Sequence, residues 1–155
     1  MTRAMALLLL AVAFVPPEAV AHSHKKKGLE IVHPWTPAMV EANIANVPVY
    51  MTLKNRANAA ERLLRATTTL ADKVELIETH SHGSMTLPTV AAALKIPAGG
   101  DLVLNSSGPH LLLSGVKKRL NAYDSFNLTL TFERAGQMVV EVMVEEAEVV
   151  EPHKH

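Results

Sequence analysis

The sequence predicts an all-β protein, a single antiparallel β-sandwich domain. Apolar and polar side chains alternate in three separate runs, which is typical of strands with one buried face. These runs are residues 47–53, 74–76 and 126–132. Turn-forming Gly, Pro, Asn and Ser residues separate the apolar runs. Seven or eight short strands with such spacing indicate a sandwich.

Residues 1–21 have the pattern of a cleaved secretory signal peptide, which is not part of the fold. Arg3 supplies the positive start, residues 4–15 are almost entirely apolar, and residues 19–21 (Ala-Val-Ala) form a small-x-small cleavage site. The apolar run is shorter than the ~20 residues that span a bilayer. We therefore expect a periplasmic protein with no membrane insertion after cleavage.

Cleavage after residue 21 would make His22 the first residue of the mature chain and His24 the third. A free amine with a histidine at the third position wraps Cu(II) or Ni(II) in a square plane, a geometry that these ions favour. His22 and His24 are therefore weaker metal-ligand candidates. The alternative is that residues 22–27, which end with three lysines, are a solvated polar leader.

The folded domain is expected over residues 28–148, with a His-containing tail at 149–155. Residues 59–70 allow a short helix or a strand, and we favour a strand at residues 63–67. A turn at residues 135–136 predicts a hairpin between the two strands that flank it. Without the signal, 134 of the 155 residues remain, which is enough for one domain with a sizeable core.

Charge and composition exclude several classes of function. The 15 acidic and 15 basic residues balance, so no field draws in nucleic acid or an anionic membrane. The chain has no cysteine, which excludes disulfides, thiol nucleophiles and thiolate metal ligands. A soft metal site must therefore use histidine and methionine, whose imidazole and thioether groups suit copper.

The best candidate for such a site is the segment that contains His80, His82 and Met85, beside a glycine turn. We predict that this segment is a loop. His110 is the fourth candidate ligand, because Gly108-Pro109 should place it at the beginning of a strand with a rigid apolar base behind it. An enzyme is not expected, since the chain lacks Gly-x-Ser-x-Gly and His-Glu-x-x-His motifs.

A series of short motifs resembles the periplasmic copper chaperone family known as PCuAC (DUF461-like). The motifs, in chain order, are Trp35-Thr36-Pro37, Val49-Tyr50-Met51-Thr52-Leu53-Lys54-Asn55, Val74-Glu75-Leu76, Ile96-Pro97-Ala98-Gly99-Gly100, Gly108-Pro109-His110-Leu111 and Leu128-Thr129-Leu130-Thr131-Phe132-Glu133. The resemblance implies a cupredoxin-like antiparallel β-sandwich, a single Greek-key domain, that binds Cu(I) through exposed His and Met side chains. It also implies a copper-accepting partner, such as the copper centre of an oxidase or its assembly factor.

The sequence departs from the ligand pattern of this family at three positions. A histidine and two methionines of the family are replaced here by Ile77, Leu87 and Leu112. Met85 and His110 are the two ligand positions that carry over from the resemblance.

Two hypotheses follow from these departures. In the first, His80 and His82 replace the missing ligands, which would extend the preference from Cu(I) towards Cu(II) or zinc. In the second, the site has decayed and the domain is a non-metal binding or scaffold module. The sequence does not predict the metal's oxidation state, the receiving partner or the oligomeric state.

Overall fold

The computed structural model describes residues 23–39, 46–83 and 85–146, and every regular element within them is a β-strand. The signal peptide, His22 and the tail therefore lie outside the described residues. No helix in the described part of the chain is long and apolar enough to cross a membrane. The strands are β1 (Ser23–Lys26), β2 (Leu29–Pro37), β3 (Asn46–Asn55), β4 (Glu61–Thr67), β5 (Ala71–His82), β6 (Met85–Val90), β7 (Leu94–Ile96), β8 (Asp101–Leu104), β9 (His110–Val116), β10 (Ser125–Phe132) and β11 (Gly136–Glu145).

The strands pair in the order β6-β5-β9-β3-β2-β11-β10-β4-β7, with β1 added to β2 and β8 added to β3. β4 also lies against β5, and β7 lies against β3 and β8, so the sheet folds back on itself into two layers. The all-β prediction is confirmed. The prediction of a purely antiparallel sandwich is wrong at one pair, because β2 and β11 run parallel, with Trp35 opposite Met143.

The core lies between the layers and is filled by alternate residues of the strands. β3 shows why: Val47, Val49, Met51 and Leu53 are buried, while the residues between them are less covered. The same alternation buries residues of β9, β10 and β11. The largest fully buried side chains are Phe132, Leu29, Ile31, Leu53, Leu63, Ile96, Leu111, Leu113, Leu120, Leu128, Leu130 and Val47.

Residues 23–26, predicted as part of a polar leader, form β1 and pair with β2. The turn between these strands is Lys27-Gly28, and both residues have positive φ angles, 50° and 80°. Such a pair is typical of a two-residue hairpin turn, which matches the twist of the flanking strands.

Glu61 is a buried carboxylate that joins the start of β4 to the β10–β11 turn. Its side chain is only 4% exposed. Oε1 accepts hydrogen bonds from the backbone N–H groups of Arg62 (2.8 Å) and Arg134 (3.0 Å), and Oε2 accepts one from Ala135 (2.9 Å). These three backbone N–H groups form charge-assisted hydrogen bonds with the carboxylate, and the bonds compensate for the water that it loses on burial.

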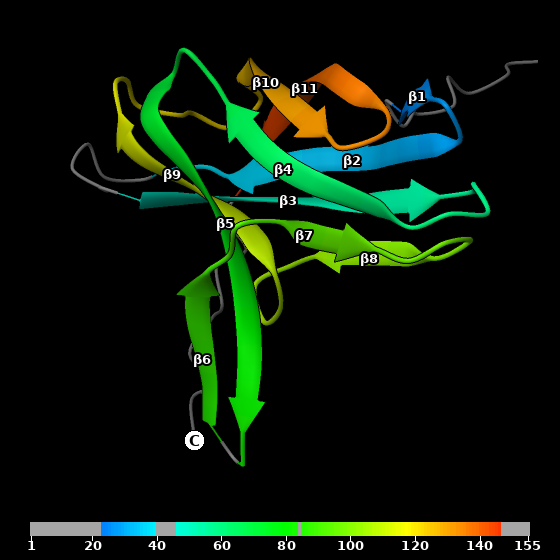
Figure 1. Ribbon diagram of the computed structural model, residues 1–155. Helices are drawn as coiled ribbons and strands as arrows, with labels where there is room; N and C mark the ends of the chain where they lie inside the picture. Colours follow the sequence, from blue (N-terminus) through cyan, green and yellow to red (C-terminus); the bar gives the residue numbers. More distant parts are fainter. Residues whose placement is uncertain (1–22, 40–45, 84, 147–155) are drawn as a thin grey trace, which may run out of the picture.

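β5 and β6 form a long hairpin that projects away from the two layers (Figure 1). β6 is the edge strand of the sheet, and all six of its residues are exposed. Just beyond β6, the Ala91 N–H donates to the Leu76 carbonyl at 2.9 Å. Along an edge strand the backbone N–H and C=O groups of alternate residues point towards the neighbouring strand and away from it. Since those of Ala91 point towards β5, the backbone groups of Thr86, Pro88 and Val90 point to the open edge.

Candidate metal site

The β5–β6 hairpin carries three of the four predicted ligands. The pairing runs from Ile77 opposite Val90 to His82 opposite Met85. Two residues connect the strands, and the first, Gly83, has a φ of 64°, which glycine adopts without a steric penalty. The segment is therefore a continuous paired ribbon, and the prediction of a loop for these residues is wrong.

His80, His82 and Met85 share one face of this ribbon. His80 and His82 are two residues apart on β5, so their side chains point to the same side. Met85 lies directly opposite His82, and opposed residues in a ladder also share a face. Met85 is 62% exposed, and both histidines are exposed as well. Two imidazoles and one thioether thus stand together on an open surface.

Glu78 is the next residue of β5 on this face. Its Oε2 lies 3.6 Å from Nε2 of His80, and both side chains are about half exposed, 49% and 52%. An exposed pair of this kind contributes little to stability, since solvent screens it. The imidazole of His80 is therefore free to leave Glu78 at little cost.

His110 is held in a defined orientation at the beginning of β9, as predicted. Its Nδ1 lies 2.9 Å from the carbonyl oxygen of Gly108. A carbonyl only accepts, so Nδ1 carries the proton and Nε2 keeps its lone pair. The ring of Tyr50 meets the imidazole edge-on, with centroids 6.3 Å apart. Leu111 and Leu113 behind it are fully buried and give the expected rigid base.

The structure does not bring His110 together with the other three candidates. His110 lies opposite Ile77 in the β5–β9 ladder. His80 and His82 are three and five residues further along β5, which is about 10 and 16 Å at 3.3 Å per residue. Because successive side chains of a strand point to opposite faces, His80 and His82 also lie on the face opposite to that of Ile77. One ion cannot contact all four side chains in this conformation.

The positions of the family ligands divide in the same way. We call the face of β5 and β9 that points away from the buried Leu111 and Leu113 the outer face. Ile77 lies on it because it is opposite His110, and Leu112 lies on it because it is two residues after His110 on β9. Leu87 lies opposite His80 on the other face, beside Met85. The outer face therefore keeps one ligand of three, and Ile77 there is only 5% exposed.

A row of aromatic rings runs across the outer face to His110. Its members, each in contact with the next, are His33, Trp35, Tyr50 and His110, with centroids 6.1, 5.0 and 6.3 Å apart. A cavity of about 280 Å³ opens beside the row. His33 has a φ of 51°, and its Nε2 lies 2.5 Å from Oε1 of Glu145.

The sequence predicts that Gly108-Pro109 positions His110, but it does not point to the ring of Tyr50 or to the hydrogen bond from Nδ1 of His110 to the Gly108 carbonyl. Tyr50 could not be singled out, because in the sequence it is an ordinary residue of the alternating run 47–53. Gly108 was noticed as a turn residue, but the use of its carbonyl depends on the fold of residues 105–109. That loop is held by Asn105, whose Oδ1 accepts from the Ser107 N–H at 2.9 Å and whose own N–H donates to the Pro109 carbonyl at 3.0 Å.

The weaker candidate His24 is part of β1, opposite Ile31. Its Nε2 is buried without a hydrogen-bond partner. Square-planar binding through a mature N-terminus would need deprotonated backbone amides, and in this conformation the strand is paired in a ladder. In the described residues, no three His, Asp or Glu side chains are grouped so that they could hold a metal ion.

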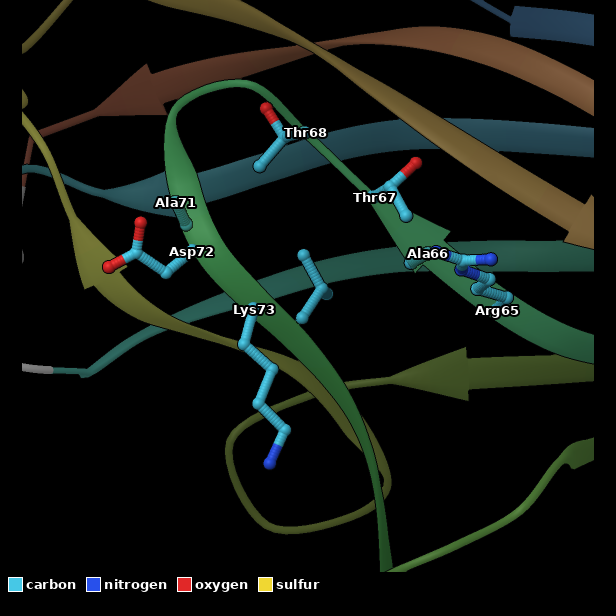
Figure 2. A pocket seen from close by; sticks show the side chains of 8 residues that line it. Arg65, Ala66, Thr67, Thr68, Ala71, Asp72 and Lys73 are labelled. Carbon is cyan, nitrogen blue, oxygen red and sulfur yellow. The ribbon is translucent and has the colours of Figure 1, made fainter.

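A second cavity, of about 260 Å³, lies between β4 and β5. Figure 2 shows that the polar side chains around it diverge: Asp72 and Lys73 point in different directions, and the hydroxyl groups of Thr67 and Thr68 turn away from both. A ligand site requires polar groups that converge. This cavity is therefore not a candidate site.

Comparison with known proteins gives one family match. The family model described as "Putative lipoprotein LpqE-like" matches residues 29–144. The "Putative lipoprotein Lxx21020" of Leifsonia xyli subsp. xyli is 26% identical over 133 residues, covering 85% of this chain and 78% of its own. An uncharacterized protein of Rickettsia prowazekii is 28% identical over 136 residues, covering 84% of this chain and 69% of its own.

Solved structures share the fold. The copper-bound PCuAC domain from PmoF2 superposes with a TM-score of 0.69 at 23% identity, covering 81% of this chain and 99% of that domain. The Cu(I) form of DR1885 from Deinococcus radiodurans gives a TM-score of 0.64 at 28% identity, covering 84% of this chain and 85% of that chain. The chain thus has the cupredoxin-like fold of PCuAC domains.

Proposed function

The chain belongs to the LpqE-like family, within the PCuAC group of domains, and from this premise we propose that it is an exported copper carrier. Copper is its cargo, and the protein is not an enzyme. Similar solved domains are described as copper-bound or Cu(I)-bound, which supports copper as the metal. Cu(I) is the favoured form, and Cu(II) and zinc are the alternatives.

The observation that carries this proposal is the placement of His and Met side chains on the projecting hairpin and at His110. His80, His82 and Met85 are exposed on one face of the ribbon, and His110 has a free Nε2 on the other. Neutral imidazole and thioether ligands hold Cu(I) without the charge attraction of a thiolate. A partner with stronger ligands can therefore take the ion.

The exposure of these ligands suits transfer by direct ligand exchange. An ion on the tip of a projecting hairpin is open to an incoming ligand before the first ligands leave. The proposed recipient is a copper-accepting protein, such as the copper centre of an oxidase or its assembly factor. The resemblance to PCuAC proteins supports this class of partner.

Export rests on the signal pattern of residues 1–21 and on the lipoprotein-like names of the family and of one relative. Cell fractionation followed by intact-mass measurement tests it. Periplasmic protein that lacks residues 1–21 is the expected result. Unprocessed protein in the cytoplasm would refute export.

A competing function is a non-metal binding or scaffold module. The observation that favours it is the replacement of two ligand positions on the outer face by Ile77 and Leu112, beside a half-buried aromatic row. The two functions differ in one measurable property, the affinity for copper.

Competition with a chromogenic Cu(I) chelator tests the proposed function. The wild-type chain should compete for one equivalent of Cu(I). A variant with His80→Ala, His82→Ala, Met85→Leu and His110→Ala should lose this ability, while His33→Ala, on a histidine paired with Glu145, should keep it. Failure of the wild-type chain to compete would favour the scaffold function.

A further inference from the structure

We infer that the hairpin tip forms a three-coordinate Cu(I) site by itself, from the imidazoles of His80 and His82 and the thioether of Met85. His110 is not a ligand to this ion. The inference rests on the proposed function and assigns its binding site. It places the ion on the face opposite to that of Ile77, His110 and Leu112.

The first step is geometric. His80 and His82 are two residues apart on an extended strand, so their Cα atoms are about 6.6 Å apart. Hydrogen-bonded and non-hydrogen-bonded pairs alternate along the β5–β6 ladder, and Ala91 forms a hydrogen-bonded pair with Leu76. By this alternation His82 and Met85 are also a hydrogen-bonded pair, and such pairs have Cα atoms about 5.5 Å apart. The three side chains therefore leave the corners of a small triangle on one face, and all three reach a point above its centre.

The second step concerns freedom of movement. All three side chains are exposed, so rotation about their side-chain bonds displaces no core residue. The partner of His80 is Glu78 at 3.6 Å, a half-exposed contact that is easily broken. The two-residue turn keeps the Cα atoms of His82 and Met85 in place while the side chains close on the ion.

The third step is the choice of metal. A thioether is a soft ligand that suits Cu(I), whereas zinc sites use cysteine, histidine and carboxylate ligands. Glu78 is also on this face, but in the part of the chain that the structure describes no three His, Asp or Glu side chains are grouped to hold a metal ion. Zinc would also leave the thioether of Met85 unused. Cu(I) accepts three ligands, and the side of the ion that faces solvent stays open for a ligand from the receiving protein.

The fourth step excludes His110. Its partner across the ladder is Ile77, and the tip ligands lie about 10 to 16 Å further along β5 at 3.3 Å per residue. Its Nδ1–H is committed to the Gly108 carbonyl, which fixes the ring on the outer face. Rotation of His110 cannot bring its Nε2 to the tip.

The experiment measures Cu(I) affinity of the full-length protein by chelator competition. His82→Ala and Met85→Leu should each weaken binding by about tenfold or more, because each removes one of three ligands. His110→Ala should stay within about twofold of wild type. Ser81→Ala, on the opposite face of the same hairpin, is the matched control and should also bind as wild type.

X-ray absorption at the copper edge gives a second measurement. The wild-type protein should show one copper–sulfur contact together with copper–nitrogen contacts, and Met85→Leu should lose the sulfur. A loss of affinity in His110→Ala equal to that in Met85→Leu would overturn the tip site and leave copper carriage intact. A wild-type chain without Cu(I) affinity would overturn both.

Discussion

His110 lies directly across the β5–β9 ladder from Ile77, and Leu112 follows two residues later on the same face. These three positions surround one point on the outer face of the sheet. Only His110 among them offers a ligand atom. They match three ligand positions of the PCuAC family that the sequence resembles, and here their side chains provide a single imidazole.

Restoring the two missing ligands should create a copper site there. A variant with Ile77→His and Leu112→Met places a second imidazole and a thioether beside Nε2 of His110. We expect copper stoichiometry to rise from one to two equivalents. Trp35 is the only tryptophan and is separated from His110 by the Tyr50 ring alone, so its fluorescence should be quenched by the second ion.

The control for this variant is Leu112→Met alone, which should keep one equivalent. Thermal unfolding must also be followed, because Ile77 is buried and an imidazole there costs part of its burial energy. A folded double variant that still binds one equivalent, with Trp35 unquenched, would contradict the prediction.

Glu61→Ala should destabilise the protein by about 2–4 kcal/mol, because it leaves three backbone N–H groups without their buried acceptor. The free energy of unfolding in urea measures this loss. Glu133→Ala is the matched control: it removes an exposed carboxylate, 3.4 Å from the guanidinium of Arg62, and should cost less than about 1 kcal/mol. Equal losses in both variants would show that Glu61 does not hold the β10–β11 turn.

The stability of the protein should fall above pH 10, in part through Tyr50. Burial raises the pKa of the Tyr50 hydroxyl above its ordinary value of 10.0. In the unfolded chain the phenol ionises first, so stability is intact below pH ~10 and is lost as the pH rises towards the folded-state pKa. Tyr50→Phe should remove this component from urea midpoints measured across the alkaline range.

A direct titration of Tyr50 needs the other tyrosine removed. A hydrogen bond to Glu146, followed by the charge of that carboxylate, also raises the pKa of Tyr123. In Tyr123→Phe, the phenolate absorbance reports on Tyr50 alone, and its midpoint should lie above 10. A midpoint at or below 10 would refute the effect of burial.

Pro88→Thr should make the protein self-associate. Pro88 lies between Thr86 and Val90 at the outward-pointing positions of the edge strand, where its missing N–H interrupts the row of donors. Threonine would complete that row and allow β6 to pair with β6 of a second copy. Sedimentation velocity should show a dimer whose fraction rises with concentration.

The matched control is Thr89→Val, which raises strand propensity at an inward-pointing position without adding an outward donor. It should sediment like the wild type. If Pro88→Thr also sediments like the wild type at every concentration, the proline does not protect this edge.

The sequence predicted those strands that have one buried and one exposed face. The alternation of residues 47–53 recurs in β3, and the strand favoured at residues 63–67 is β4, with Leu63 buried. His110 begins β9, as Gly108-Pro109 predicted. In each case burial of one face leaves a period of two in the sequence.

The outer half of the hairpin could not be predicted in this way. Residues 78–82 are exposed or half exposed on both faces, so no core imposes an apolar period on them. Their strand structure comes from backbone pairing with β6. Nothing in the residue pattern alone indicates that His82 lies opposite Met85, or that His110 lies on the other face.

The parallel contact between β2 and β11 has a consequence for folding. Trp35 and Met143 are neighbours in this contact although more than one hundred residues separate them in the chain. β2 is flanked by β3 on one side and by the last strand on the other. Contacts between such distant residues slow folding, because a long loop must close before they form. The sheet can therefore be completed only after the whole domain has been synthesised, as a late step of folding.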